Sequence, residues 1–158
     1  MSNPIMQVHG AWVTADCWAS FRSFFEAKGY RVVVPPWPYL DKPVEELRRN
    51  PDPRLAKITI KDLVDHFERQ IQVLPEKPIL IGHSFGGLIV QILLDRGLGY
   101  AGVAIDARPP RGMLPSATAV GAALPVLAGL ESRRDNVVQE LLHDVREHAA
   151  DGRAAQGL

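Results

Sequence analysis

The sequence predicts an α/β fold, a short parallel sheet of about four strands flanked by helices. Short apolar runs alternate with segments of helical periodicity along the first two thirds of the chain, as is typical of parallel sheets with crossover helices. A glycine-rich junction at residues 82–87 joins one such run to a helical segment. The 158 residues, 46% of them apolar and 23% charged, match one ordinary domain and argue against wholesale disorder.

The first elements alternate regularly. Residues 5–8 form an apolar run that predicts a strand, and residues 16–28 predict a helix before Gly29. Trp18, Phe21 and Phe25 recur at helical spacing, which places them on one face of this helix. Residues 31–34 are a β-branched run that predicts a second strand, and the prolines that follow end it.

The next elements include the clearest helix of the chain. A long connection to residue 58 contains a possible short helix at 43–49. Thr59 and Asp62 have the spacing of a capping box, which predicts a helix start. The apolar stripe of this helix consists of Ile60, Leu63, Val64, Phe67, Ile71 and Leu74. A strand at 79–81, a mostly apolar helix at 85–96 and a strand at 101–105 follow.

The character of the chain changes after Pro109 and Pro110. We therefore expect a core at residues 1–112 and a helical, cap-like segment and tail at 113–158. Residues 112–130 carry no charge, which allows either a membrane span or a buried or loosely packed helix pair. Interruption by proline, glycine and alanine favours the helix pair. Apolar residues at 137–145 predict one amphipathic helix in the tail.

Charge and cysteine usage exclude several functions. Eighteen basic residues balance eighteen acidic ones, so a general nucleic-acid binder is not expected. A single cysteine, Cys17, excludes an intramolecular disulfide framework and a multi-cysteine metal site. The five histidines show no pairing at i, i+4, and no metal or other cofactor is expected. The start of the chain does not have the pattern of a signal peptide, which together with the one cysteine indicates a cytoplasmic protein.

The residues Gly82-His83-Ser84-Phe85-Gly86 form a G-x-S-x-G pentapeptide between a predicted strand and a predicted helix. In this context the chain must turn sharply, and side chains at 82 and 86 would crowd the turn. Ser84 would then lie on strained backbone at the apex, with the Phe85 N–H and the helix dipole facing developing negative charge. The alternative is a glycine-rich turn that contains an incidental serine.

A second element, His9-Gly10-Ala11-Trp12, follows the first strand. Gly10 permits an unusual backbone turn at this position. The N–H of Ala11 or Trp12 would then supply a second donor to an oxyanion, since that donor comes from the loop after the first strand of such a unit.

The two elements in this order resemble the α/β-hydrolase superfamily, especially its esterase, lipase and hydroxynitrile-lyase-like branch. The resemblance covers residues 5 to about 112 and describes an incomplete core of that fold followed by a helical tail. It implies that Ser84 is the nucleophile and that the amides of Phe85 and of Ala11 or Trp12 form an oxyanion hole. His9, Gly10, Gly82 and Gly86 then support the motifs, and His83 is a structural neighbour of the nucleophile and not its base.

The sequence departs from the superfamily pattern at the acidic residue and the histidine that would assist the serine. In the superfamily an Asp or Glu and then a His follow the serine, after later strands, and no such strands are predicted here. Asp106 ends the last predicted strand and is the candidate acid. His143 and His148 are the histidines after Ser84 and are candidate bases, although a solvated helix face also explains them. We expect His66 to lie on the outer, exposed face of the helix that begins after Thr59.

Two functions remain open. The first is a serine hydrolase that acts on an ester, thioester or related acyl bond of a small molecule through Ser84. The second is a truncated, non-catalytic relative that serves as a binding or interaction module; a lyase on the same fold is a third possibility. Trp12, Trp37, Tyr39 and Phe85 suggest an apolar or aromatic acyl group. The strand at 101–105 would be an apolar sheet edge, which predicts self-association, burial under residues 112–130 or poor folding.

Overall fold

The computed structural model describes residues 2–108 and 121. Residues 2–52 and 58–108 make one compact unit, to which the following description applies, whereas residues 53–57 do not belong to it. The order of elements is β1 (Ile5–Val8), η1 (Ala15–Trp18), α1 (Ala19–Ala27), β2 (Val32–Val33), α2 (Val44–Arg49), η2 (Pro53–Lys57), α3 (Ile60–Gln72), β3 (Ile79–His83), α4 (Phe85–Asp95) and β4 (Ala101–Ile105).

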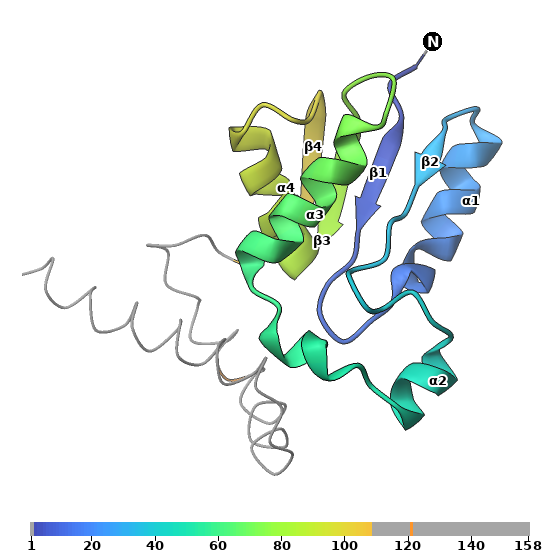
Figure 1. Ribbon diagram of the computed structural model, residues 1–158. Coiled ribbons are helices and arrows are strands. Elements are labelled where there is room, and N and C mark those ends of the chain that lie inside the picture. The colour runs from blue at the N-terminus through green and yellow to red at the C-terminus, as the bar shows by residue number, and fades with distance from the viewer. Residues whose placement is uncertain (1, 109–120, 122–158) are drawn as a thin grey trace, which may run out of the picture. The chain divides into compact units, whose positions relative to one another are not determined.

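The four strands form one parallel sheet in the order β2-β1-β3-β4 (Figure 1). Ile5 pairs in register with Val32 on one side and with Ile79 on the other, and Ile79 pairs with Ala101. Because the strands are parallel, their carboxyl ends meet at one edge of the sheet, where α/β proteins place ligands. The predicted fold class is therefore confirmed for the described part of the chain.

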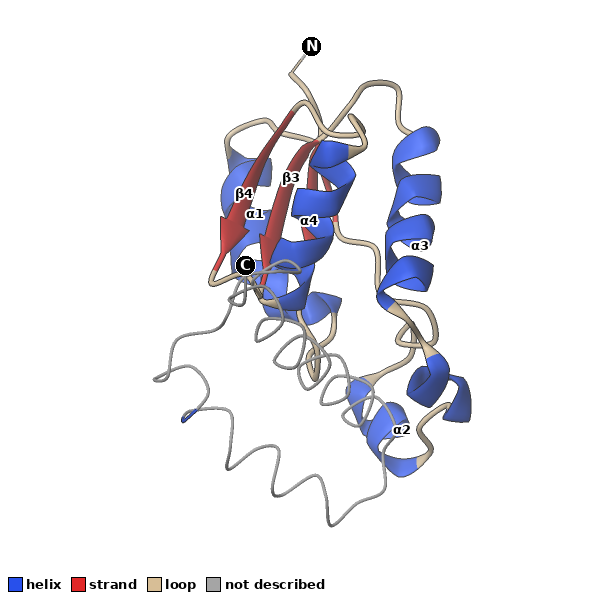
Figure 2. Cartoon of the chain, turned by 90° about the vertical axis from the view of Figure 1, so that its left-hand side faces the viewer, coloured by secondary structure: helices blue, strands red, loops and turns tan. Residues whose placement is uncertain are grey.

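Helices α3 and α4 cover one face of the sheet, and α1 lies over the opposite face beside β2 (Figures 1 and 2). The stripe predicted for α3 buries Leu63, Val64, Phe67 and Ile71. Helix α4 is apolar nearly all round because it is enclosed between the sheet and α3, and seven of its residues from Phe85 to Leu93 are buried.

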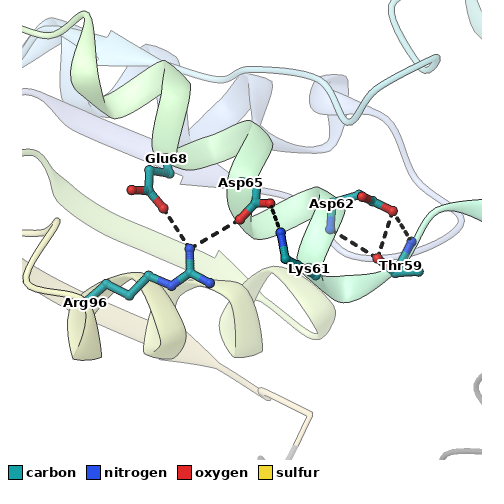
Figure 3. A network of polar contacts seen from close by, with 6 residues as sticks. All are labelled: Thr59, Lys61, Asp62, Asp65, Glu68 and Arg96. Carbon is teal, nitrogen blue, oxygen red and sulfur yellow. Dashed lines mark hydrogen bonds and ion pairs between the residues drawn. The ribbon is translucent and has the colours of Figure 1, made fainter.

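A capping box and a polar network hold α3 in place (Figure 3). The Thr59 hydroxyl accepts from the Asp62 N–H at 3.2 Å, and the Asp62 carboxylate accepts from the Thr59 N–H at 3.0 Å, as the sequence predicts. Arg96, at the end of α4, donates to Glu68 of α3 at 2.7 Å. The capping box fixes where α3 begins, and the Arg96 contact joins the two helices.

The first helical segment differs from its prediction. It begins as the 3-10 turn η1 and becomes α-helical only at Ala19. Trp18 is buried with Ile5 and Val32, but Phe21 is 49% exposed. Phe21 meets the ring of Trp18 edge-on with centroids 5.3 Å apart, and Phe25 packs against the buried cluster that contains Trp18, so the three rings are buried unequally. Strand β2 is also shorter than the predicted 31–34.

Strand β4 lies at the edge of the described sheet. Val103 pairs in register with Ile81 and lies on the same face of the sheet. On this face α1 packs beside β2, away from β4, and Val103 is 50% exposed. The predicted apolar edge is thus present, while self-association through it stays a prediction. None of the helices in the described ranges has the length and apolar character that a membrane crossing needs. The expected boundary near residue 112 and the predicted tail helix lie outside the described residues.

Replacing Phe67 tests whether the α3 stripe supports the fold. Phe67 is fully buried, so Phe67→Ala is expected to lower the free energy of unfolding by about 3–5 kcal/mol through lost burial and a residual cavity. Phe24→Ala is the matched control, because the ring of Phe24 is mostly exposed. Urea denaturation of both variants measures the difference, and equal losses would contradict this account of the core.

Candidate active site

Ser84 lies at the junction between β3 and α4, at the carboxyl edge of the sheet. Its φ of 56° and ψ of −119° place it in strained backbone that non-glycine residues rarely adopt. The residue is partly exposed, whereas Phe85 next to it is buried. The N–H of Phe85 is the first of α4, and no carbonyl one turn earlier in the helix is available to it.

The glycines on either side of Ser84 permit backbone to touch backbone. A Cβ on Gly86 would lie 2.1 Å from the Val8 carbonyl oxygen, and one on Gly82 would lie 2.2 Å from that of Gly86. Neither clash can be relieved by turning a side chain, because the opposing atoms are main chain. The start of α4 therefore lies directly on the end of β1.

The loop after β1 reaches the serine. A Cβ on Gly10 would lie 3.1 Å from Ser84 Cβ and 3.2 Å from the His83 carbonyl oxygen. Close approach, rather than an unusual turn at Gly10, explains this glycine. The left-handed residue of the loop is instead Trp12, with φ of 65°, so the expectation that Gly10 makes the turn is wrong. Ala11 is partly exposed and Trp12 is exposed.

The imidazole of His9 holds this loop through two hydrogen bonds. Its Nδ1 lies 2.9 Å from the Gly10 carbonyl oxygen, and its Nε2 lies 3.2 Å from the Trp37 backbone nitrogen. Nε2 must accept from that N–H, so the hydrogen-bond network assigns the proton to Nδ1. The rings of His9 and Trp37 stack with centroids 5.2 Å apart. Burial lowers the pKa of His9, although its hydrogen bond to Gly10 opposes the shift, and the imidazole is held neutral.

The segment after β4 completes the surroundings of Ser84. The Ser84 N–H donates to the Ile105 carbonyl at 3.0 Å, and the Arg108 N–H donates to the Ser84 carbonyl at 3.2 Å. Asp106 lies between these contacts with φ of 42° and is exposed. The candidate acid thus lies at the same edge of the sheet as the serine, and its carboxylate makes no hydrogen bond to a histidine among the described residues.

Other predicted residues are placed elsewhere. His83 ends β3 and is exposed. His66 is half-buried, because its Nε2 contacts the Pro36 carbonyl at 3.0 Å, and the prediction of an exposed His66 is wrong. Among the four aromatics expected near a substrate, Trp37 is buried against His9. His143 and His148 lie outside the described residues.

Sequence reasoning did not find two contacts of this site. The engagement of His9 by Trp37 spans 28 positions, and no local pattern reveals it. The second is the contact between Arg108 and Phe85, in which the guanidinium carbon lies 4.9 Å from the centroid of the ring. A basic residue two positions after Asp106 was the only available signal, and by itself it predicts nothing.

A parallel sheet with a strained serine between a strand and a glycine-relieved helix is typical of α/β-hydrolases. The comparison of sequences agrees with this class. The chain belongs to the Alpha/beta hydrolase family, whose model matches residues 8–157. No curated protein matches the sequence significantly.

Solved structures share this fold at low sequence identity. An extracellular alpha/beta-hydrolase from a Paenibacillus species is 21% identical, with a TM-score of 0.60 over 81% of this chain and 52% of that one. Tomato methylketone synthase I, a variant bound to β-ketoheptanoate, is 21% identical, with a TM-score of 0.57 over 82% and 49%. Polyneuridine aldehyde esterase is 22% identical, with a TM-score of 0.54 over 80% and 48%. The chain spans about half the length of these proteins.

The buried state of His9 predicts how stability depends on pH. Its native pKa is lowered, so below about 6.5 the unfolded chain binds a proton that the native chain does not. The free energy of unfolding should be level above that pH and fall on acidification until the native pKa is reached, by at most about 1.4 kcal/mol per pH unit for each such histidine.

His66 contributes in the same direction, because burial also lowers its pKa. Unfolding free energies from pH 8 to pH 5 should therefore be measured for the wild type and for His66→Gln. The variant is expected to retain a decline, and the double variant His9→Gln/His66→Gln to lose it. A level profile in His66→Gln alone would show that His9 is not held neutral.

Proposed function

We propose that this chain provides the nucleophile and oxyanion site of a serine hydrolase that acts on an ester, thioester or related acyl bond. The observation that carries the proposal is the position of Ser84, on left-handed backbone against the loop at Gly10. Family membership supports hydrolysis as the general activity. Esterase and methylketone synthase neighbours on the same fold are consistent with acyl substrates.

The proposed reaction begins when Ser84 Oγ attacks the acyl carbonyl carbon and the carbonyl π electrons move to its oxygen. The N–H of Phe85 and that of Ala11 or Trp12 would donate to this oxyanion, and loss of one such donor typically costs a hundredfold or more in rate. Collapse breaks the bond to the alcohol or thiol, which leaves with a proton. Water then attacks the acyl-enzyme, releases the acid and restores the Ser84 hydroxyl.

A base must accept the Ser84 proton, and His9 is unsuited to this role because both of its ring nitrogens are engaged within the fold. His143 or His148 remains the proposed base, and Asp106 the proposed acid at the edge of the sheet. The proposal for Ser84 and the oxyanion loop therefore has more structural support than the proposal for the base, because His143 and His148 lie outside the described residues.

The second candidate is a non-catalytic relative that binds a ligand or partner. The engagement of His9 favours it, since among the described residues this histidine is held in hydrogen bonds away from Ser84. Under this proposal the elbow is retained as a structural turn, and Ser84 has the low reactivity of an ordinary hydroxyl.

A fluorophosphonate probe separates the two candidates. Labelling of the purified chain should depend on Ser84 and be lost in Ser84→Ala, because only an activated hydroxyl displaces fluoride from phosphorus rapidly. Intact-mass spectrometry measures the adduct, and circular dichroism establishes that both proteins are folded. Absence of labelling in a folded wild-type sample would overturn the hydrolase proposal and support the binding module.

A further inference from the structure

We propose that the outer edge of β2 binds an extended, basic peptide segment of a partner protein, which adds to the sheet as a further strand. This site is separate from the candidate active site, because β1 lies between β2 and the strand that precedes Ser84. The proposal therefore goes beyond the proposed hydrolase function and does not depend on it.

A cavity of about 530 Å³ lies along β2. Its lining combines residues of β2, the proline-rich segment that follows this strand, and side chains of α1 and α3. Because α1 and α3 cover opposite faces of the sheet (Figure 1), the cavity lies between them, at the place where a neighbouring strand would pair with β2. Its volume is within the range of ligand-binding sites.

The backbone of β2 presents free hydrogen-bonding groups along this cavity. The Ile5 N–H donates to the Arg31 carbonyl at 2.8 Å, so the backbone groups of residue 31 face β1. Successive residues of a strand present these groups to opposite sides. Those of Val32 and Val34, which line the cavity, therefore face away from β1. They repeat at a spacing of roughly 6.6 Å, which is the spacing of alternate residues in another extended chain.

Two polar side chains of α3 add neutral hydrogen-bonding groups. His66 Nε2 lies 3.0 Å from the Pro36 carbonyl oxygen, which can only accept, so Nδ1 is left as an acceptor. Gln70 lies one turn later on α3, lines the same cavity and makes no hydrogen bond to another described residue. A donor and two acceptors of this kind suit the amide groups of a peptide.

The charges beside the cavity favour a basic peptide. Arg22 lines it, but its Nε donates to Glu26 at 2.8 Å, which balances this charge. Asp41 also lines it, is exposed and forms no ion pair with a described residue. Lys42 next to it is paired with Glu46 at 2.6 Å. A lysine near one end of the peptide would therefore be attracted to Asp41, with the modest energy of an exposed ion pair.

The prolines after β2 restrict what can pair with it. Pro35 and Pro36 have no backbone N–H, so a partner strand gains donors only from the residues that precede them. Short edges that end in proline disfavour open-ended association of sheets. A short peptide segment, whose alternate side chains would contact Val33, Pro36 and Trp37, fits this edge better than a second sheet does.

The test uses the blocked hexapeptide acetyl-Lys-Val-Thr-Val-Thr-Lys-amide, whose β-branched residues favour an extended chain. NMR on the full chain gives the dissociation constant by titration and the hydrogen-exchange rates of single amides. With free peptide at ten times that constant, the Val32 and Val34 N–H groups should exchange about tenfold more slowly, because occupancy then leaves about one site in eleven open. The same peptide N-methylated at its four central residues lacks backbone donors and is expected not to bind.

Matched variants locate the peptide in the cavity. Gln70→Ala should weaken binding by about two- to tenfold, the usual worth of one neutral hydrogen bond, whereas Gln72→Ala, at the exposed end of α3, should not. Asp41→Asn should weaken binding by about 1.5- to fivefold and remove the preference for this peptide over one with glutamate at both ends. Asp95→Asn is its control, since it removes the same charge from an exposed residue of α4.

Several outcomes would overturn the proposal. Slower exchange at Ala101 and Val103, in place of Val32 and Val34, would put the peptide on β4. Equal binding of the N-methylated peptide would show that no strand is added. Slow exchange of Val32 and Val34 without peptide, lost on dilution, would show that a second copy of the chain occupies this edge. Failure of the hexapeptide to bind the folded chain would also refute it.

Discussion

The contact between the start of α4 and the end of β1 is the constraint on which the rest of the site depends. Gly86 rests against the Val8 carbonyl without room for a methyl group. That contact brings the first turn of α4 onto the edge of the sheet, which turns the chain at Ser84 and holds the loop at Gly10 against it. The oxyanion geometry proposed for this protein is thus a consequence of main-chain packing, with the side chains added to it.

The order of elements could be predicted from the sequence because each depends on local physics. The α3 stripe and its capping box involve residues three or four apart, and β3 and α4 are marked by a change in apolar periodicity. The exposure of Phe21 could not be predicted, since periodicity shows that a face is apolar but not how much of the sheet the helix covers. The length of β2 could not be predicted either, because pairing with β1 decides where the strand ends and not the extent of the β-branched run.

The candidate site divides along a similar line. A motif fixes the residues within it, so the place of Ser84 between strand and helix followed from five consecutive letters. Contacts between segments that are distant in the sequence have no local motif that would predict them. His9 meets Trp37, and Arg108 meets Phe85, only because the parallel strands end at one edge and bring their following loops together. Topology, rather than local pattern, therefore supplies the other half of the surroundings of Ser84.

The three tryptophans differ sharply in their surroundings, and this gives the protein a built-in optical reporter. Trp18 and Trp37 are enclosed in the fold, whereas Trp12 is 64% exposed on the loop that faces Ser84. An aqueous quencher such as iodide would therefore reach the indole of Trp12 and spare the other two. The emission of Trp12 reports on the loop that is proposed to supply one of the two oxyanion donors, so occupancy of the site can be observed without any attached dye.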